Sequence, residues 1–501
     1  MQALCVQDGG TVWRQYSAGG GCFGDQPRYG IQVPEDHGQT GLRWEKRYET
    51  TGGRIRSGCC EWNDVARQSF AQVNLGIRDG KIAAITSSPL EAREVIDARG
   101  RYVSPGFIDF HSHVDGNAYA AECIVRQGGT TTLGGERSLN GKTIRNIAEE
   151  GFIINHGFFV SQSFALRDAV GIKSIYEPAE EREIGAMVDL AARFMESGAC
   201  GICFSLELIP GVSSKELFEI TKVAKAYHKP VTIHLRKDGR EALETLDEIF
   251  ELAAKTEASI HLLELMYMVG MAGTMPKALE LIDQARRSGL DITADSGVYD
   301  AYTVCIGTGV FDPGWQSGYL GKSYQDLVIS SGIHLGETCS EPLFRHLREN
   351  SPSTLITAFV GDSDAVAMAL QKDYVYVSTN ASDGPCYPMA GSPEMAGTYP
   401  RLIGRFVREQ GELSLMEAIR KITILPALRF GLKDIGSLEM GKNADMVIFD
   451  YDTIMDRADY VTRGNPDEAP DGISWVIVNG HVVVRDGTLL PENKHGLYIK
   501  V

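Results

Sequence analysis

The feature that most constrains the fold is a regular alternation of short apolar segments with amphipathic segments between residues 102 and 384. The apolar segments are short and nearly continuous, as expected for strands buried on both faces. Amphipathic stretches at residues 181–198 and 213–229 predict helices between them. Eight strands alternating with helices predict an α/β fold with a closed parallel (β/α)8 TIM barrel. The eight segments are residues 102–113, 129–135, 152–163, 198–205, 229–236, 258–265, 290–296 and 373–384.

The segments on either side of this region predict antiparallel strands joined by tight turns. Polarity alternates around an Asp-Gly pair at residues 79–80, and an Asn-Gly pair at residues 479–480 gives a second hairpin signal. Residues 1–70 are rich in Gly, Gln, Arg and Asp and show no apolar periodicity. The predicted division is an irregular N-terminal extension (1–70), a small β-domain from both chain ends (71–104 and 430–501) and the barrel (105–429).

Composition excludes several classes of partner. The chain has 501 residues, 43% of them hydrophobic, and a formal net charge of -17. This acidic balance argues against binding the phosphate backbone of nucleic acids or an anionic membrane surface. No run is long enough to span a bilayer, and the start lacks the pattern of a secretory signal. The ten cysteines show no dense framework, so we expect reduced thiols in a cytoplasmic protein.

Two histidines end the first barrel segment, "SPGFIDFHSHVDG". Side chains two residues apart on a strand point to the same face, so His111 and His113 could converge on one point. That point could be a metal ion, or the two could be polar residues at a strand end. In a TIM barrel, functional side chains gather at the carboxyl ends of the strands, which gives a way to choose.

Other residues able to bind a metal follow the ends of other predicted strands. His234 closes "PVTIHLR", His261 lies in "ASIHLLE", Glu136 follows "TTTLGG" and Asp383 follows "VYVSTNAS". Each of these residues alone has a structural interpretation, as a hydrogen-bonded histidine, a solvated carboxylate or a turn residue. Together, four imidazoles and two carboxylates on five strands favour a site for one or two zinc ions.

Several motifs resemble the amidohydrolase superfamily, and in particular its D-aminoacylase (N-acyl-D-amino-acid deacylase) branch. They include "PGFIDFHSH", "TIHLRKDG", "SDG" and "GSLEMGKNADMVIFD", in this order. An HxH pair alone is a weak signal, whereas the ordered set is a strong one. The resemblance implies a distorted (β/α)8 barrel with a small β-sandwich domain formed by both chain ends.

The resemblance also implies roles for the site residues. His234 and His261 would hold the tighter zinc with the second-strand residue, Glu136, while His111 and His113 would face a second, weaker metal position. Asp383 would be both a metal ligand and the catalytic general base and acid. The implied activity is metal-dependent hydrolysis of an amide, in which metal-activated water attacks the carbonyl.

The chain departs from the family pattern at four positions. Glu136 stands where a cysteine is common, and a carboxylate is a harder ligand that also suits Mn²⁺ or another divalent ion. Leu263 replaces a lysine, Glu394 an arginine and Leu208 a tyrosine. The two missing cations usually hold the substrate's α-carboxylate, so the expected substrate is a small amide other than a standard N-acyl-D-amino acid. If Glu394 faces the substrate, replacing it by Arg should improve turnover of acidic substrates.

Two further residues are candidates for substrate binding. Arg236 keeps its motif and could meet a carboxylate, or could form an ion pair behind the site. Tyr299 lies in the family's tyrosine region and could either hydrogen-bond substrate or be packed in the core.

Alternative functions remain open at this point. The same metal site could hydrolyse a cyclic amide or deaminate a heterocycle, and relatives of cyclic amide hydrolases include non-catalytic scaffolds. The latter would have lost metal ligands, whereas this chain retains the whole set. A homo-oligomer is compatible with the sequence, which predicts neither a nucleic-acid nor a membrane partner.

Overall fold

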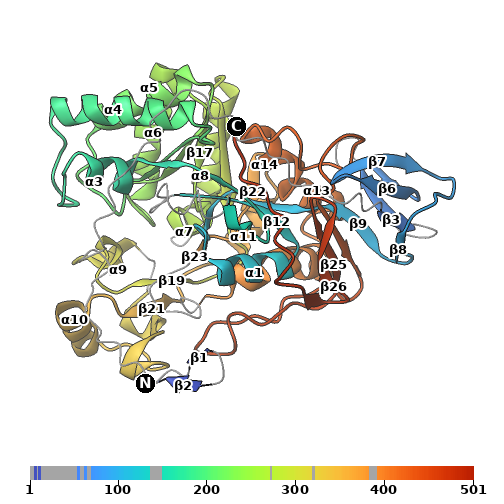
Figure 1. Cartoon of the computed structure of the whole chain (residues 1–501). Helices are drawn as coiled ribbons and strands as arrows, with labels where there is room; N and C mark the ends of the chain where they lie inside the picture. The colour runs from blue at the N-terminus through green and yellow to red at the C-terminus, as the bar shows by residue number, and fades with distance from the viewer. Residues whose placement is uncertain are drawn as a thin grey trace.

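A computed structural model describes the side chains of most of the chain (Figure 1). The described ranges are residues 69–135, 149–270, 273–318, 322–382 and 392–501, apart from the side chains at 267–268 and 381–382. Four short strands outside them are described by their backbone: β1 (Cys5–Gln7), β2 (Gly10–Val12), β3 (Gly53–Arg56) and β4 (Glu61–Asp64).

Eight parallel strands form the barrel, and each lies in one of the eight predicted segments. Their near-continuous apolar composition follows from burial on both faces. The predicted barrel is therefore confirmed. The strands are β10 (Phe107–Asp109), β12 (Gly129–Gly134), β13 (Asn155–Phe158), β15 (Ile202–Ser205), β16 (Val231–His234), β17 (Ile260–Leu262), β18 (Ile292–Ser296) and β22 (Val375–Val377).

The barrel is distorted, because its sheet is in two parts. One part has the order β10-β12-β13, and the other runs from β14 (Val160–Ser161) through β15, β16, β17 and β18 to β22. The chain passes from β13 through Phe159 into β14 and so joins the two parts. A parallel pair of β11 (Ser112–His113) with β23 (Ala381–Ser382) links the first strand to the last.

Helices follow the strands and pack against the outside of the barrel (Figure 1). Both predicted helices are present, as α4 and α5. The described helices are α1 (Ala118–Arg126), η1 (Gln162–Leu166), α3 (Arg167–Ala169), α4 (Glu181–Glu196), α5 (Ser214–Ala226), α6 (Ala242–Thr256), α7 (Leu265–Met268), α8 (Met275–Arg287), α11 (Ser363–Leu370), α12 (Glu394–Arg401), η6 (Leu402–Glu409), α13 (Leu415–Lys421) and α14 (Ile424–Arg429).

A small antiparallel lobe is inserted between β18 and β22, where the sequence predicted only a connection. Its sheet has the order β19-β21-β20, and the rings of Trp315 and Phe344 stack between two of its helices. In Figure 1 it lies to one side of the barrel. Its elements are β19 (Tyr302–Cys305), η3 (Gly309–Phe311), α9 (Trp315–Gly318), η4 (Tyr324–Asp326), β20 (Leu327–Ile329), η5 (Gly332–His334), α10 (Glu341–Asn350) and β21 (Leu355–Ala358).

Both chain ends build two further sheets, as the resemblance implied. The larger sheet has the order β27-β26-β25-β24-β9-β4-β5 and the smaller β7-β6-β3-β8. Along β24, Met446 and Ile448 pack with the smaller sheet, while Val447 and Phe449 join the main core. The strands are β5 (Ser69–Ala71), β6 (Asn74–Arg78), β7 (Lys81–Thr86), β8 (Glu94–Asp97), β9 (Tyr102–Pro105), β24 (Met446–Phe449), β25 (Ile473–Val478), β26 (His481–Arg485) and β27 (Thr488–Leu489).

Residues 1–70, which the sequence predicted to be an irregular extension, contribute strands to both sheets. β3 pairs with β6 and β8, and β4 pairs with β5 and β9. Backbone hydrogen bonds hold these strands in place, so they need no apolar alternation of their own, which is why the sequence did not indicate them. The division into domains stays a prediction.

Two local predictions can also be compared with the structure. The turns at residues 79–80 and 479–480 join the hairpins β6–β7 and β25–β26, with positive φ at both residues of each turn. The expectation of reduced cysteines was wrong at Cys305, which is disulfide-bonded. Cys123, Cys200, Cys203 and Cys339 are buried, reduced thiols.

Candidate metal centre

Three of the four predicted histidine ligands lie on strands β11, β16 and β17, and His111 lies directly before β11. His111, His113, His234 and His261 are all buried. The two predicted carboxylate ligands, Glu136 and Asp383, lie outside the described residues. In the sequence, Glu136 comes directly after Gly135, and Asp383 directly after β23, whose Ser382 is in register with His113.

Two of the histidines contact one buried carboxylate, Asp295, on β18. Its Oδ2 lies 3.4 Å from Nδ1 of His111 and 3.1 Å from Nε2 of His261, and its Oδ1 accepts a hydrogen bond of 2.9 Å from the backbone N–H of Glu264. Burial alone raises the pKa of Asp295, but the contacts with both imidazoles hold it below its usual range. Asp295 is not among the predicted ligands, although it lies near the carboxyl end of the predicted strand "LDITADS", where functional side chains are expected.

The other two histidines are linked through Glu264 and Asn380. Glu264 Oε2 lies 2.8 Å from Nε2 of His234, and its Oε1 accepts a hydrogen bond from the Asn380 amide. The Asn380 Oδ1 in turn lies 3.1 Å from Nε2 of His113. Glu264 and Asn380 both have left-handed backbone conformations, with φ of 55° and 47°. No sequence pattern marked either residue.

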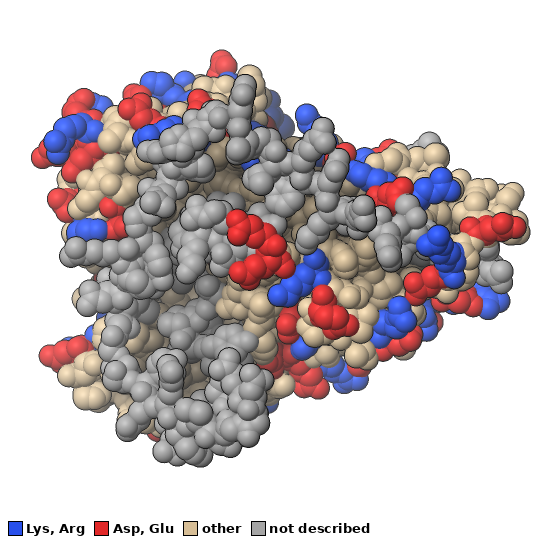
Figure 2. All heavy atoms as spheres, viewed as in Figure 1, with Lys and Arg blue, Asp and Glu red and all other residues tan. Residues whose placement is uncertain are grey.

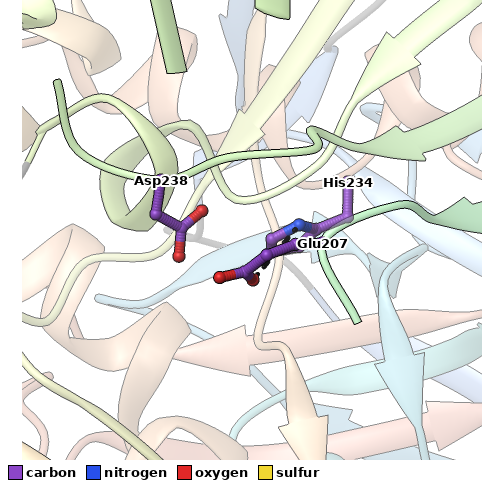
Figure 3. A group of neighbouring side chains, drawn as sticks. All are labelled: Glu207, His234 and Asp238. Atoms are coloured by element: carbon purple, nitrogen blue, oxygen red, sulfur yellow. Dashed lines mark ion pairs between the residues drawn. The ribbon is translucent and has the colours of Figure 1, made fainter. Parts of the chain in front are cut away.

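A third group of side chains lies beside His234 and consists of Glu207 and Asp238 (Figure 3). Ligand atoms of Glu207, His234 and Asp238 all lie within 4.8 Å of one another. Burial is the main cause that raises the pKa values of Glu207 and Asp238, and the charge of Glu264 raises both further, while a hydrogen bond from Asp238 lowers that of Glu207. Burial alone lowers the pKa of His234, but Glu264, Asp238 and Glu207 raise it well above its ordinary value.

These contacts group the histidines differently from the predicted pairs. The resemblance implied His234 with His261 and His111 with His113, whereas in the structure His111 and His261 share Asp295. The predicted ligand roles stay predictions. The donor set nevertheless suits a divalent cation: imidazole nitrogens and carboxylate oxygens are buried together, and the closely spaced carboxylates would be stabilised by a positive ion.

Arg236 and Tyr299 are both engaged by neighbouring acids. The Arg236 guanidinium donates from Nε and Nη2 to the two oxygens of Glu248, at 2.7 and 3.0 Å. This ion pair is the structural alternative that the sequence left open. Tyr299 is packed in the core, where its hydroxyl donates to Asp456 at 3.1 Å, and burial raises its pKa well above the ordinary value.

The third predicted substrate residue, Glu394, is the first residue of α12 and is buried. Its Oε2 accepts a hydrogen bond of 2.8 Å from the Ser392 hydroxyl. Its backbone oxygen accepts a bond of 3.3 Å from the Gln127 amide. Its predicted place at the substrate stays a prediction.

A family model for the amidohydrolase family matches residues 102–483. The chain belongs to the amidohydrolase family. An N-acyl-D-glutamate deacylase from Alcaligenes xylosoxydans xylosoxydans is 27% identical to it over 454 residues, covering 82% of this chain and 90% of that protein. A D-aminoacylase from the same organism is 27% identical over 453 residues, covering 83% and 91%.

Solved structures show the same fold. An N-acyl-D-glutamate deacylase from Bordetella bronchiseptica, complexed with zinc and a phosphonate inhibitor, superposes with a TM-score of 0.78 at 24% identity, covering 90% of this chain and all of that one. The resemblance seen in the motifs is thus confirmed. This amidohydrolase is a hydrolase of carbon–nitrogen bonds other than peptide bonds.

Acidic and basic side chains are interspersed on the described part of the face seen in Figure 2. Within the part of the chain that the structure describes, every helix is too short or too polar to cross a membrane.

Proposed function

We propose that this amidohydrolase removes the acyl group from an N-acyl amino acid or a closely related amide, using a bound divalent metal ion. The observation that carries the proposal is the group of four buried histidines on the barrel strands, with buried carboxylates between them. Two relatives that are 27% identical over most of the chain are named N-acyl-D-glutamate deacylase and D-aminoacylase, which indicates the substrate class.

The residues that would hold the metal are those predicted from the sequence. His111, His113, His234 and His261 supply imidazole nitrogens, and Glu136 and Asp383 supply oxygens. Zinc is the proposed ion, at one or two positions, because nitrogen-rich sites favour it and the Bordetella enzyme is complexed with zinc. When bound, the ion would act as a Lewis acid that lowers the pKa of the attacking water toward ~7 and polarises the scissile carbonyl.

The chain's own groups position the metal ligands and move the proton. Asp295 would hold the rings of His111 and His261, and Glu264 the ring of His234. Asp383 would take a proton from the attacking water and return it to the leaving amine nitrogen. The products would be a carboxylic acid and a free amine.

Metal removal and the substitution Asp383→Asn test this function. Chelation should abolish hydrolysis of N-acyl-D-amino acids, and added Zn²⁺ should restore it. Asp383→Asn should lower kcat by at least ~100-fold, which is the usual contribution of a general base. Asp373→Asn is a matched control, because Asp373 is exposed two residues before β22, the barrel strand that precedes β23 and Asp383. Hydrolysis that survives both chelation and Asp383→Asn would overturn the proposal.

The substrate's charge can be tested at Glu394. Because this carboxylate is buried, Arg would place a cation in its buried site, so Glu394→Gln is the better test. If Glu394 faces the substrate, Glu394→Gln should raise kcat/KM for N-acyl-D-glutamate roughly tenfold, since like charges in contact are unfavourable. The kcat/KM for the corresponding uncharged diamide should stay constant. An equal change for both substrates would place Glu394 away from the substrate.

A further inference from the structure

We propose that Glu264, rather than His261, is the metal ligand that the β17 segment supplies to the candidate metal centre, next to His234. The inference rests on the proposed function for the presence of the metal ion, and it changes one of the proposed ligands. The family resemblance implies His261 at this position, and Glu264 is not among the ligands that it implies.

The strand pairing places His261 deeper in the barrel than His234. In the parallel pair of β16 and β17, His261 is in register with Thr232, two residues before His234. At ~3.3 Å per residue, its Cα lies roughly 7 Å nearer the amino end along the strand direction than that of His234. The same register puts Glu264 one residue beyond the level of His234. Glu264 is therefore at the carboxyl end of the barrel, where functional side chains gather.

Both ring nitrogens of His261 are engaged by oxygen atoms of β18. Nδ1 lies 2.7 Å from the Thr293 hydroxyl, and Nε2 lies 3.1 Å from Oδ2 of Asp295. An ionised carboxylate only accepts, so Nε2 donates to Asp295 and Nδ1 accepts from Thr293, which leaves no lone pair for an ion. The ring is fully buried, and three aromatic rings lie around it with centroids at 5.2, 5.7 and 5.6 Å: Phe110, Tyr376 and Phe430.

The hydrogen bonding of His234 indicates that its Nε2 is the nitrogen that would bind the ion. Nδ1 lies 3.2 Å from the backbone oxygen of Leu235, which is an acceptor, so Nδ1 carries a proton. Metal-binding histidines usually donate one ring N–H to a carbonyl or carboxylate in this way and present the other nitrogen to the metal.

The carboxylate of Glu264 lies directly at this nitrogen. Its Oε2 is 2.8 Å from Nε2 of His234. With the proton on Nδ1, both atoms are acceptors, and two acceptors this close need a proton or a metal ion between them. Two ligand atoms can share an ion if they are separated by less than twice the metal–ligand distance of ~2.1 Å, and this pair meets that condition.

The backbone of Glu264 is held in an uncommon conformation by its neighbours. Its φ of 55° and ψ of 44° lie in the left-handed region, which side chains other than Gly rarely adopt. Its N–H donates to Asp295 at 2.9 Å, and its Oε1 accepts from the amide of Asn380, whose Oδ1 lies 3.1 Å from Nε2 of His113. Such conformations persist where surrounding contacts determine them, and they concentrate at functional sites. The carboxylate thus lies between two predicted imidazole ligands, His113 and His234.

Two substitutions separate a metal ligand from a residue that only orients His234. Glu264→Gln keeps the size of the side chain and an acceptor for the Asn380 amide but removes the carboxylate, whereas Glu264→His supplies a nitrogen ligand but removes both carboxylate contacts. Zinc retention by the full chain against a competing chelator should fall more than ~100-fold in Glu264→Gln, beyond the ~10–100-fold loss typical of a residue that orients a ligand. It should stay within about tenfold of the wild type in Glu264→His, because imidazole is also a zinc ligand.

His261→Gln tests the other half of the inference. The Gln amide offers one donor and one acceptor in place of the two ring nitrogens, but no imidazole. Zinc retention should fall by no more than about tenfold in His261→Gln, because the residue would act only through Asp295. Glu257→Gln is the matched control, because Glu257 precedes the same strand with a left-handed φ of 52° and an 83% exposed side chain. It should retain zinc as the wild type does.

A measurement on the wild type covers the case in which the variants do not fold. Zinc-bound crystals should show an anomalous peak within coordination distance of the Glu264 carboxylate and His234 Nε2. A peak coordinated by His261, or zinc retention by folded Glu264→Gln that equals the wild type, would overturn the inference. Equal losses in folded Glu264→Gln and Glu264→His would also overturn it. In each case chelator-sensitive hydrolysis leaves the proposed function standing, whereas hydrolysis that survives chelation overturns the proposed function itself.

Discussion

The carboxylate of Asp295 contacts two of the four candidate histidine ligands. It is fully buried on β18, and its two oxygens contact His111, His261 and the backbone N–H of Glu264. A carboxylate in this position fixes the orientation of both imidazole rings. Asp295 is therefore expected to determine metal affinity even if it does not bind the metal directly.

We expect Asp295→Asn to weaken zinc binding by ~10–100-fold, because an amide nitrogen cannot accept the hydrogen bonds that the carboxylate accepts. Zinc retention against a competing chelator measures this effect. Asp291→Asn is the control, since Asp291 directly precedes the same strand, with its carboxylate exposed and paired with Arg429. Equal zinc retention in the two variants would show that Asp295 does not position the ligands.

At the scale of residues, the sequence indicated where the four buried histidines lie, but it did not indicate the polar residues that contact their rings. Strand-end position selected His111, His113, His234 and His261, because parallel strands bring their carboxyl ends to one edge. Glu264 and Asn380 could not be found in this way. Their place depends on left-handed backbone conformations after β17 and β22, which depend on the surrounding packing.

At the scale of elements, the C-terminal segment is the least expected feature. It falls within the range predicted for the small β-domain, and its backbone lies along the barrel strand β13. Gly496 and Tyr498 form bridges with Phe152 and His156, and the Tyr498 ring stacks on Phe158 at 6.1 Å. The segment therefore occupies the edge left where the barrel sheet is divided between β13 and β14.

Gly496 tests whether this segment stabilises the barrel. A Cβ at Gly496 would lie 1.9 Å from the backbone oxygen of Ile154. The backbone would have to shift to relieve this overlap, which costs free energy of folding. We expect Gly496→Ala to destabilise the protein by about 1–3 kcal/mol, and thermal unfolding measures this loss. Gly185→Ala in α4, where a Cβ meets nothing within 4 Å, should instead stabilise by about 0.5–1 kcal/mol. Equal midpoints for the two variants would contradict this account.

The elements that the sequence predicted are those with their own apolar pattern. All eight barrel strands, α4 and α5 carry such a pattern, because each buries a continuous face. β3 and β4 instead pair with a strand on each side, and the C-terminal segment pairs with β13, all through backbone hydrogen bonds. Pairing of this kind leaves little trace in the side chains, so only the structure reveals it.

At the scale of the whole molecule, one buried carboxylate links the barrel to the small β-domain. Asp445 directly precedes β24, and its oxygens accept hydrogen bonds from Asn155 on β13 (3.0 Å) and from the backbone of Asn479 in the β25–β26 turn (2.6 Å). The side-chain oxygen of Asn155 also accepts from Leu497 in the C-terminal segment. Burial is the main cause that raises the pKa of Asp445 from 3.8 to about 7.

This pKa predicts how stability depends on pH. The folded state binds the Asp445 proton more tightly than the unfolded state does, so this contribution to stability is complete below the unfolded pKa. It is lost as the pH rises through the folded pKa of about 7. The asparagine side chain in Asp445→Asn does not ionise, so the stability of this variant should lack this pH-dependent contribution. Relative to the variant, the wild type should therefore lose about 2–3 kcal/mol between about pH 5 and about pH 8.

Urea unfolding of both proteins across this pH range measures the difference, with tryptophan fluorescence as the signal. Asp434→Asn is the control, because the Asp434 side chain is 71% exposed and its contact with Lys81 is a surface ion pair of 3.8 Å. Its pH profile should run parallel to that of the wild type. If the Asp445→Asn profile also runs parallel to the wild type, the carboxylate ionises as easily in the folded state as in the unfolded state. Water would then reach the Asp445 carboxylate between the barrel and the small β-domain, whereas in the structure this carboxylate is buried.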